Sequence, residues 1–132
     1  MIKDTLLKEK KDLLAEIEKA LKDQPKKSET GFLGAARYNE LNARLDRLLY
    51  RFELEKVRLD INERNVWAKT VEKFSGGTGK EREAKVYQEQ EYIEARMAFE
   101  ISDSSCKELA RMSKNLERAY HIYLSFAERA KA

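Results

Sequence analysis

Apolar residues recur three and four positions apart along three long stretches of the chain, from about residue 4 to 23, 35 to 73 and 81 to 130. This spacing gathers the apolar side chains on one face of an α-helix, while lysine, arginine and glutamate fill the other faces. Asp4 stands where its carboxylate would cap the first helix. The pattern therefore predicts an all-α protein built from three helices.

Two breaks separate these stretches, at residues 24–34 and 74–80. The first contains Pro25 and two glycines, and the second contains three of the five glycines of the chain. Proline and glycine interrupt helices, so we expect a loop at each break. Phe32 and Leu33 lie in the first loop and are expected to pack against a neighbouring helix.

The third stretch carries a heptad frame that holds from end to end without a slip. Its members are Tyr92, Ala95, Phe99, Ser102, Cys106, Leu109, Ser113, Leu116, Tyr120, Tyr123 and Ala127. Steps that alternate between three and four residues are typical of coiled coils. Ser105 and Glu108 have the spacing of a capping box, so a second helix start at this point stays open. Because the frame keeps its register through Ser102–Ser105, we favour one long helix, either straight or kinked.

The two longer stretches predict a coiled-coil-like, antiparallel helical hairpin joined by the glycine-rich break. At 1.5 Å per residue, the second helix would be about 58 Å long and the third about 75 Å. The first helix is an additional N-terminal helix that covers only part of such a hairpin. The apolar residues expected to stay uncovered are Leu54, Val57, Ile61, Met97, Ile101, Met112 and Phe126. We therefore expect a homo-oligomer in which other copies bury them.

Composition narrows the class of protein. The 132 residues fit one helical domain, residues 1–132, and 39% of them are charged, with a net charge of +3. The N-terminal sequence MIKDTLLKEKKDLL lacks the apolar run of a secretory signal, and no stretch approaches the ~20 apolar residues of a membrane span. Cys106 is the only cysteine, which excludes an intrachain disulfide and suits a reducing compartment. We expect a soluble, cytoplasmic protein.

The stretch FSGGTGK at residues 74–80 is similar to a phosphate-binding loop but does not match its template. Placing Gly79 and Lys80 on the final Gly-Lys of G-x-x-x-x-G-K-[ST] puts Phe74 on the first glycine and Glu81 on the hydroxyl residue. The stretch also follows a helical pattern, whereas a phosphate-binding loop follows a buried strand. We interpret its glycines as a turn in which φ is positive.

Residues suited to catalysis or to metal binding are scarce. His121 is the only histidine, and Glu117 precedes it by four residues, whereas the helical di-iron motif has a spacing of three. Cys106 lies on the heptad frame, where a small buried thiol is expected. We therefore predict a protein that is not an enzyme and that has no catalytic residue, bound metal or cofactor.

Basic residues surround the glycine turn. They are Lys69, Lys73, Lys80, Arg82 and Lys85, with Trp67 and Phe74 interleaved. Exposed cations bind the phosphates of single-stranded nucleic acid, and aromatic rings stack on its bases. The five basic residues and Trp67 are therefore the candidate DNA-binding residues. The alternative for such a group is a solvated helix face.

Four arginines form a second basic group, on one face of the second helix. They are Arg44, Arg47, Arg51 and Arg58, with Glu40 and Glu55 on the same stripe. Side chains three or four residues apart on a helix are neighbours, so we expect Glu40 to pair with Arg44 and Glu55 with Arg51.

Three features of the chain carry a family resemblance. They are the Phe74-Ser75-Gly76 turn after a helix, the charged stretch KEREAKVYQEQEYIEARMAFE, and a final amphipathic stretch with Cys106, Leu109 and His121-Ile122. In these features the chain resembles the phage recombination mediators of the UvsY type. The resemblance implies a small helical protein that forms ring-like homo-oligomers and binds single-stranded DNA. It also implies partners, a RecA-like recombinase and a single-strand-binding protein, and DNA contacts from Lys69 and Lys73.

Two functions follow from these observations. In the first, the protein is a non-enzymatic, single-stranded-DNA-binding accessory factor that helps load a recombinase. Its affinity for DNA would fall steeply as salt rises. In the second, it is a structural or adaptor protein that binds a partner protein through an exposed apolar surface, and its charges serve solubility.

Overall fold

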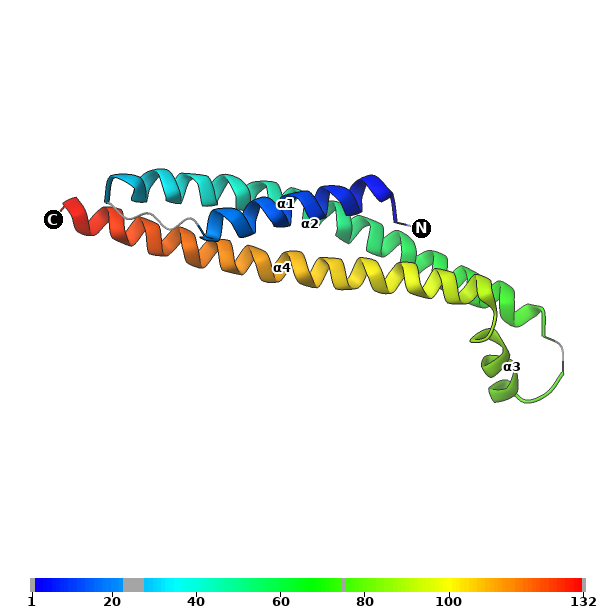
Figure 1. Ribbon diagram of the computed structural model, residues 1–132. Coiled ribbons are helices and arrows are strands. Elements are labelled where there is room, and N and C mark those ends of the chain that lie inside the picture. Colours follow the sequence, from blue (N-terminus) through cyan, green and yellow to red (C-terminus); the bar gives the residue numbers. More distant parts are fainter. Residues whose placement is uncertain (1, 23–27, 75, 132) are drawn as a thin grey trace. The chain divides into compact units, whose positions relative to one another are not determined.

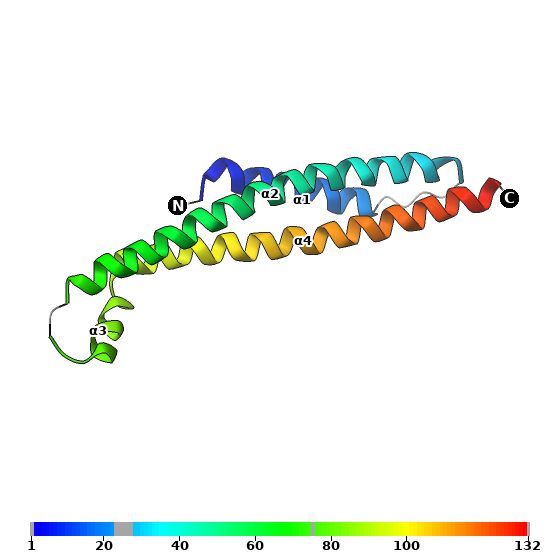
Figure 2. The ribbon, with the colours of Figure 1, turned by 180° about the vertical axis from the view of Figure 1, so that it is seen from behind.

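The computed structural model of the chain describes residues 2–22, 28–74 and 76–131. These residues form four α-helices and no strand: α1 (Asp4–Lys22), α2 (Ser28–Glu72), α3 (Gly79–Val86) and α4 (Gln90–Lys131). α2 and α4 run antiparallel and pack together as a hairpin (Figure 1, Figure 2). The predicted all-α hairpin with an additional N-terminal helix is therefore confirmed. None of the described helices is both long enough and apolar enough to span a membrane.

The chain divides into two compact units, and both long helices contribute to each. Unit 1 comprises Phe52–Cys106 with the residues before Asp4, and it includes the connection from α2 through α3 to α4. Unit 2 comprises Asp4–Arg51 and the chain from Lys107 onward, and it includes α1.

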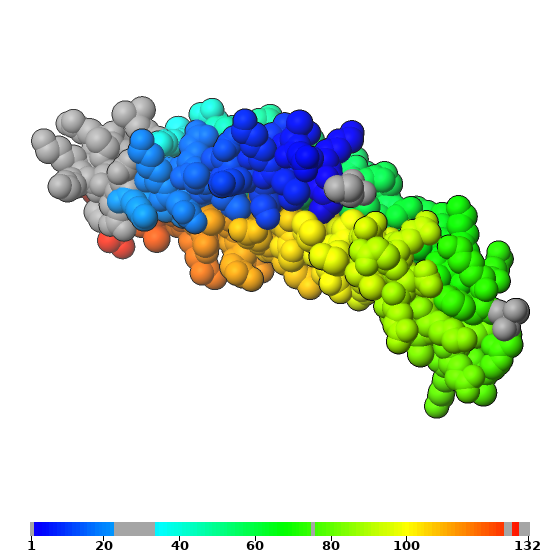
Figure 3. Space-filling view, turned by 45° about the vertical axis from the view of Figure 1, so that its right-hand side comes forward, coloured from blue at the N-terminus to red at the C-terminus, as the bar shows by residue number. Residues whose placement is uncertain are grey.

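Unit 2 is a three-helix core. Side chains that are fully or almost fully buried come from all three helices: Leu13 and Ile17 of α1, Leu45 of α2, and Leu109 and Leu116 of α4. In the space-filling view, α1 (blue) lies between the cyan segment of α2 and the orange segment of α4 (Figure 3). Apolar burial against two neighbours thus holds α1 in place, although more than half of its residues are charged or polar.

The start of α2 differs from the prediction. Residues 28–34 were expected to be a loop, but α2 begins at Ser28 and includes both glycines of this stretch. Gly34 lies against the ring of Tyr123, where a Cβ atom would come within 2.7 Å of Tyr123 Cδ1. Glycine serves close packing here and does not break the helix. Residues 24–27 and the side chains of Phe32 and Leu33 lie outside the described part of the chain.

The third predicted helix is two helices, which corrects the prediction at its N-terminal end. α3 ends at Val86, a short turn follows, and α4 begins at Gln90. In the turn, the N–H groups of Gln88 and Glu89 donate to the carbonyls three residues earlier, at 3.1 and 3.0 Å. This break directs Val86 into the core of unit 1, where it is fully buried.

α4 is continuous through its polar centre, as predicted. Ser102 and Ser105 are buried, and the hydroxyl of Ser102 donates to the carbonyl oxygen of Phe52 at 3.3 Å. A buried serine with a hydrogen-bond partner in the facing helix leaves no unsatisfied donor. The capping box suggested by Ser105 and Glu108 is therefore not used.

The glycine stretch is a turn. Gly76 and Gly77 have positive φ angles, 98° and 78°, in the region that favours glycine. Thr78 then caps α3, because its hydroxyl accepts from the N–H of Glu81 at 3.2 Å and the Glu81 carboxylate accepts from the N–H of Thr78 at 3.4 Å. This capping box places Lys80 and Arg82 in the first turn of α3.

Candidate nucleic-acid-binding surface

An apolar cluster in unit 1 joins the end of α2 to α3 and to the start of α4. Its buried members are Val66, Val86, Tyr92 and Ala95, and Trp67, Val71 and Phe74 pack against it. Since each of the three helices contributes to it, the cluster fixes the short helix α3 relative to the hairpin within this unit.

Three aromatic rings meet on this cluster. The ring centroids of Trp67 and Tyr87 are 5.3 Å apart, those of Trp67 and Tyr92 are 5.4 Å apart, and those of Tyr87 and Tyr92 are 5.7 Å apart. The rings are tilted or edge-on, as their quadrupoles favour. Tyr92 is buried and Trp67 is half-buried, but Tyr87 is 60% exposed. Tyr87 therefore presents a ring to solvent while two other rings hold it.

A buried carboxylate, that of Glu63, forms a hydrogen bond with Tyr92 of this cluster. Glu63 is only 8% exposed, and its Oε1 accepts from the Tyr92 hydroxyl at 3.0 Å and from Arg96 Nη1 at 2.9 Å. Burial, together with the hydrogen bond to Glu63, raises the pKa of Tyr92 above its ordinary value. Tyr92 thus keeps its proton and donates a hydrogen bond to Glu63, which fixes the orientation of the ring.

The five predicted basic residues all lie in unit 1: Lys69 on α2, Lys73 just after α2, and Lys80, Arg82 and Lys85 on α3. Lys69, Lys73, Lys80 and Lys85 are exposed, and Arg82 is half-buried. We call these five residues and Tyr87 the tip surface. Lys73 Nζ lies 3.8 Å from the Glu91 carboxylate, and Lys85 Nζ lies 5.7 Å from the centre of the Phe74 ring. Lys69, Lys80 and Lys85 form no ion pair with any residue that the structure describes.

Arg82 has an unusual environment. Its Nε atom is buried and has no hydrogen-bond partner among the described residues. A buried donor without a partner costs free energy, so a rearrangement of the Arg82 side chain that brings its Nε to an acceptor would be favourable.

Carboxylates balance the charges of this segment. From residue 69 to residue 91 there are five basic residues and five glutamates, so the segment has no net charge. The glutamates are Glu72, Glu81, Glu83, Glu89 and Glu91. Glu91 faces Lys73, and the Glu81 carboxylate is held by the capping box. Any attraction of the tip surface for phosphates is therefore local and does not come from a broad positive field.

Sequence reasoning named Trp67 as the stacking residue and missed Tyr87. The structure packs one side of Trp67 against the apolar cluster, and its predicted contact with bases stays a prediction. Tyr87 lies in the break between α3 and α4, and that break was the missing signal. In one continuous helix, Tyr87 would have no reason to meet Trp67.

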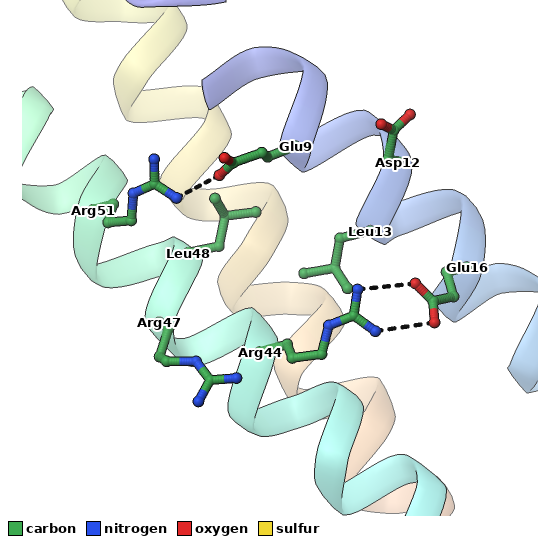
Figure 4. A pocket seen from close by; sticks show the side chains of 8 residues that line it. All are labelled: Glu9, Asp12, Leu13, Glu16, Arg44, Arg47, Leu48 and Arg51. Atoms are coloured by element: carbon green, nitrogen blue, oxygen red, sulfur yellow. Dashed lines mark hydrogen bonds and ion pairs between the residues drawn. The ribbon is translucent and has the colours of Figure 1, made fainter. Parts of the chain in front are cut away.

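The arginines of the second basic group have other partners than expected. Arg44 makes two hydrogen bonds of 3.0 Å to Glu16 of α1, and Arg51 pairs with Glu9 of α1 (Figure 4). The predicted pairs with Glu40 and Glu55 are therefore wrong, because α1 supplies the partners of Arg44 and Arg51, and Glu55 pairs with Arg58 of its own helix.

The same residues line a cleft of about 440 Å³ between α1 and α2 of unit 2 (Figure 4). Its lining residues are Glu9, Asp12, Leu13, Glu16, Arg44, Arg47, Leu48 and Arg51. The hydrogen bond from Arg44 lowers the pKa of Glu16 below its ordinary value. Since two of the three arginines are paired with α1, we interpret the cleft as a charged seam that attaches α1 to α2.

The remaining candidates for chemistry are isolated. Cys106 is buried, and burial raises the pKa of its thiol, which keeps it protonated and unreactive. His121 is exposed, with its ring 5.4 Å from that of Tyr120. Within the described residues, no group of three or more His, Cys, Asp or Glu side chains could hold a metal ion.

Comparison of the chain with protein-family models, with curated proteins and with solved structures finds no match. The resemblance to the recombination mediators of the UvsY type therefore stays a prediction, and the function must be argued from the tip surface itself.

Proposed function

We propose that the protein binds single-stranded DNA through the tip surface and acts, without enzymatic activity, as an accessory factor that helps load a recombinase. The observation that supports this proposal best is Tyr87. Its ring is 60% exposed, is braced by Trp67 and Tyr92, and belongs to the segment of the chain that carries the five basic residues of the tip surface. A rigid exposed ring beside cations is the combination that binds unpaired bases and their phosphates.

Each residue of the tip surface has a distinct task in this proposal. Tyr87 stacks on a base, and Trp67 holds the Tyr87 ring from behind. Lys69, Lys80 and Lys85 contact phosphates, because their ammonium groups are exposed and form no ion pair with described residues. Arg82 contacts a phosphate through its guanidinium, and Lys73 exchanges Glu91 for a phosphate.

The charge balance of the segment predicts an unusual salt dependence. With five phosphate contacts per chain, the logarithm of the binding constant would fall with the logarithm of salt with a slope of about −3.5. Stacking depends little on salt, so a substantial part of the affinity would persist when salt is raised. Duplex DNA hides its bases and would bind more weakly.

The experiment is fluorescence anisotropy of a labelled single-stranded oligonucleotide, titrated with the protein over a salt series. Tyr87→Ala should weaken binding by about 5- to 150-fold, the contribution of one stacked base, whereas Tyr87→Phe should bind almost as the wild type does. Tyr50→Ala is the matched control, because Tyr50 is 61% exposed but lies in unit 2. Equal binding by the Tyr87→Ala and wild-type proteins would contradict the proposal.

The phosphate contacts have their own test. The triple variant Lys69→Gln, Lys80→Gln, Lys85→Gln should reduce the magnitude of the salt slope by about 2, at 0.7 per contact. The triple variant Lys8→Gln, Lys11→Gln, Lys114→Gln removes three exposed lysines of unit 2 and changes the net charge by the same amount. If both triple variants lose affinity equally, binding depends on net charge alone and the tip surface is not the site.

The exposed apolar side chains favour a second function, that of an adaptor for a partner protein. Leu54, Val57, Ile61, Met97 and Ile101 are all more than two-fifths exposed in unit 1. Large exposed apolar residues mark surfaces that bind other proteins. Absence of oligonucleotide binding even at low salt would favour this function over the first.

A further inference from the structure

One carboxylate of unit 1, that of Glu83, has no structural task. The Glu83 side chain is exposed and forms no hydrogen bond or ion pair with any described residue. By contrast, Glu81 completes the capping box of α3, and Glu91 faces Lys73. An unpaired carboxylate repels phosphates, so Glu83 would weaken a surface that binds only the backbone of DNA.

Glu83 lies one helical turn before the exposed ring of the tip surface. Tyr87 ends α3 with helical dihedral angles, φ −62° and ψ −18°, and its N–H donates to the carbonyl oxygen of Glu83 at 3.2 Å. Side chains four residues apart share one face of a helix, with their Cβ atoms about 5–6 Å apart. The Glu83 carboxylate is therefore within reach of the edge of a base that stacks on the Tyr87 ring.

The chemistry of this pair selects one base. An ionised carboxylate only accepts hydrogen bonds, and its two oxygens accept from two neighbouring donors at once. Guanine is the base of DNA that presents two neighbouring donors, N1–H and N2–H, on its Watson–Crick edge, and this edge is open in a single strand. We propose that Tyr87 and Glu83 together form a guanine-binding site, in which the base stacks on Tyr87 and donates both hydrogen bonds to Glu83.

The other bases fit this pair less well. Adenine and cytosine each offer one amino group beside a ring nitrogen that is an acceptor, and thymine offers one N–H between two carbonyl oxygens, which repel a carboxylate. The Watson–Crick edge lies opposite the glycosidic bond, so a guanine bound in this way directs its sugar and phosphates away from Glu83. Glu83 then does not oppose the phosphate contacts of the tip surface. The inference rests on the proposed function, because it names the base that the tip surface selects in a DNA strand.

Titration with single nucleotides tests the site directly. Trp67 is the only tryptophan, and its ring centroid lies 5.3 Å from that of Tyr87, so its fluorescence reports a base that stacks there. Wild-type protein should bind deoxyguanosine monophosphate at least about 5-fold more tightly than thymidine monophosphate, the lower end of what a bidentate contact contributes. Deoxyinosine monophosphate keeps N1–H but lacks the amino group, and its affinity should fall between the two. Equal affinities for the guanine and thymine nucleotides, or no binding of either, would overturn the proposal.

Glu83→Gln tests the role of the carboxylate. The carboxamide has one acceptor and one donor group, so the variant should lose the preference for guanine. Its affinity for the thymine nucleotide should stay the same or rise, because the negative charge is gone, whereas a purely structural role would weaken both nucleotides equally. Glu72→Gln is the matched control, since Glu72 is also exposed and unpaired in unit 1 but lies about 140° around α2 from Trp67.

Circular dichroism checks that both variants stay helical. A guanine preference that survives Glu83→Gln, or that Glu72→Gln abolishes equally, would contradict the assignment.

Oligonucleotide anisotropy separates the guanine site from the proposed function. Two labelled single strands of equal length are compared, one of thymine alone and one of alternating guanine and thymine, in lithium salt so that guanines do not form four-stranded structures. Wild-type protein should prefer the guanine-containing strand, and the Glu83→Gln protein should not. Equal binding of the two strands by the wild type would refute the guanine site alone. Binding of deoxyguanosine monophosphate without binding of either strand would refute the proposed function alone.

Discussion

The hydroxyl of Tyr92 donates a 3.0 Å hydrogen bond to the carboxylate of Glu63, which is buried beneath the aromatic cluster of unit 1. The bond joins α4 to α2, and the Tyr92 ring in turn contacts both Trp67 and Tyr87. The exposed ring of the tip surface therefore depends on a buried carboxylate, which Arg96 also contacts.

Replacement of Glu63 by alanine should destabilise unit 1. The variant leaves the buried Tyr92 hydroxyl without its acceptor, which costs about 1–3 kcal/mol of the free energy of unfolding. Urea denaturation followed by circular dichroism measures this change. Glu100→Ala is the control, because Glu100 also pairs with Arg96 but is exposed, and surface pairs contribute less than about 1 kcal/mol. Equal effects of the two variants would show that the Tyr92 bond is unimportant.

The pair of Arg44 and Glu16 predicts a small acid sensitivity in the attachment of α1. The pKa of Glu16 is lowered in the folded state by the hydrogen bond from Arg44. Its stabilising contribution is therefore fully present above the unfolded pKa of about 4.3 and is lost as pH falls through the lower folded value. Both side chains are more than a third exposed, so solvent screening limits the contribution to less than about 1 kcal/mol.

Thermal denaturation between about pH 5 and pH 3 measures this effect. Arg44→Met should lose less stability on acidification than the wild type, because its Glu16 carboxylate no longer has the hydrogen bonds from Arg44 that protonation would break. Arg47→Met is the control, since Arg47 lines the same cleft but forms no ion pair with a described residue. A wild-type acid dependence shared by the Arg44→Met protein would argue against the assignment.

The turn between α2 and α3 predicts opposite effects for two neighbouring glycines. Gly76 has a φ of 98° and open space around its Cβ position, so Gly76→Ala should cost about 1–2 kcal/mol through backbone strain alone. Gly79 starts α3 without a positive φ and also has open space, so Gly79→Ala should leave stability unchanged or raise it by up to about 1 kcal/mol. Chemical denaturation of both variants checks the contrast, and destabilisation by Gly79→Ala would contradict it.

Gly34 reverses an ordinary rule. Alanine in place of glycine within a helix usually stabilises by about 1 kcal/mol. At this position the new methyl group would lie 2.7 Å from Tyr123 Cδ1, so Gly34→Ala should destabilise by about 1–3 kcal/mol. A double-mutant cycle with Tyr123→Leu tests the cause, because removal of the ring should reduce the cost of the alanine. An unchanged cost in the Tyr123→Leu background would place the strain elsewhere.

The sequence by itself determined the features that depend on neighbouring residues. Apolar spacing decided that the chain is helical, and the positive-φ glycines decided where the hairpin turns. The heptad frame kept α4 continuous across its serines, because a helix that buries one face does not need every member of that face to be apolar. The exposure of Leu54, Val57 and Ile61 also followed from spacing alone. The second helix carries two apolar stripes, and the hairpin partner covers only one of them.

Tertiary contacts decided the rest, and each involves residues far apart in the chain. A glycine is required at helical position 34 because the Tyr123 ring occupies the space that a side chain would fill. Arg44 selects Glu16 of another helix over Glu40 of its own. Val86 is buried only because the chain breaks after it, and that break brings Tyr87 onto Trp67. Packing of this kind depends on the positions of whole helices, which the local spacing of apolar and polar residues does not encode.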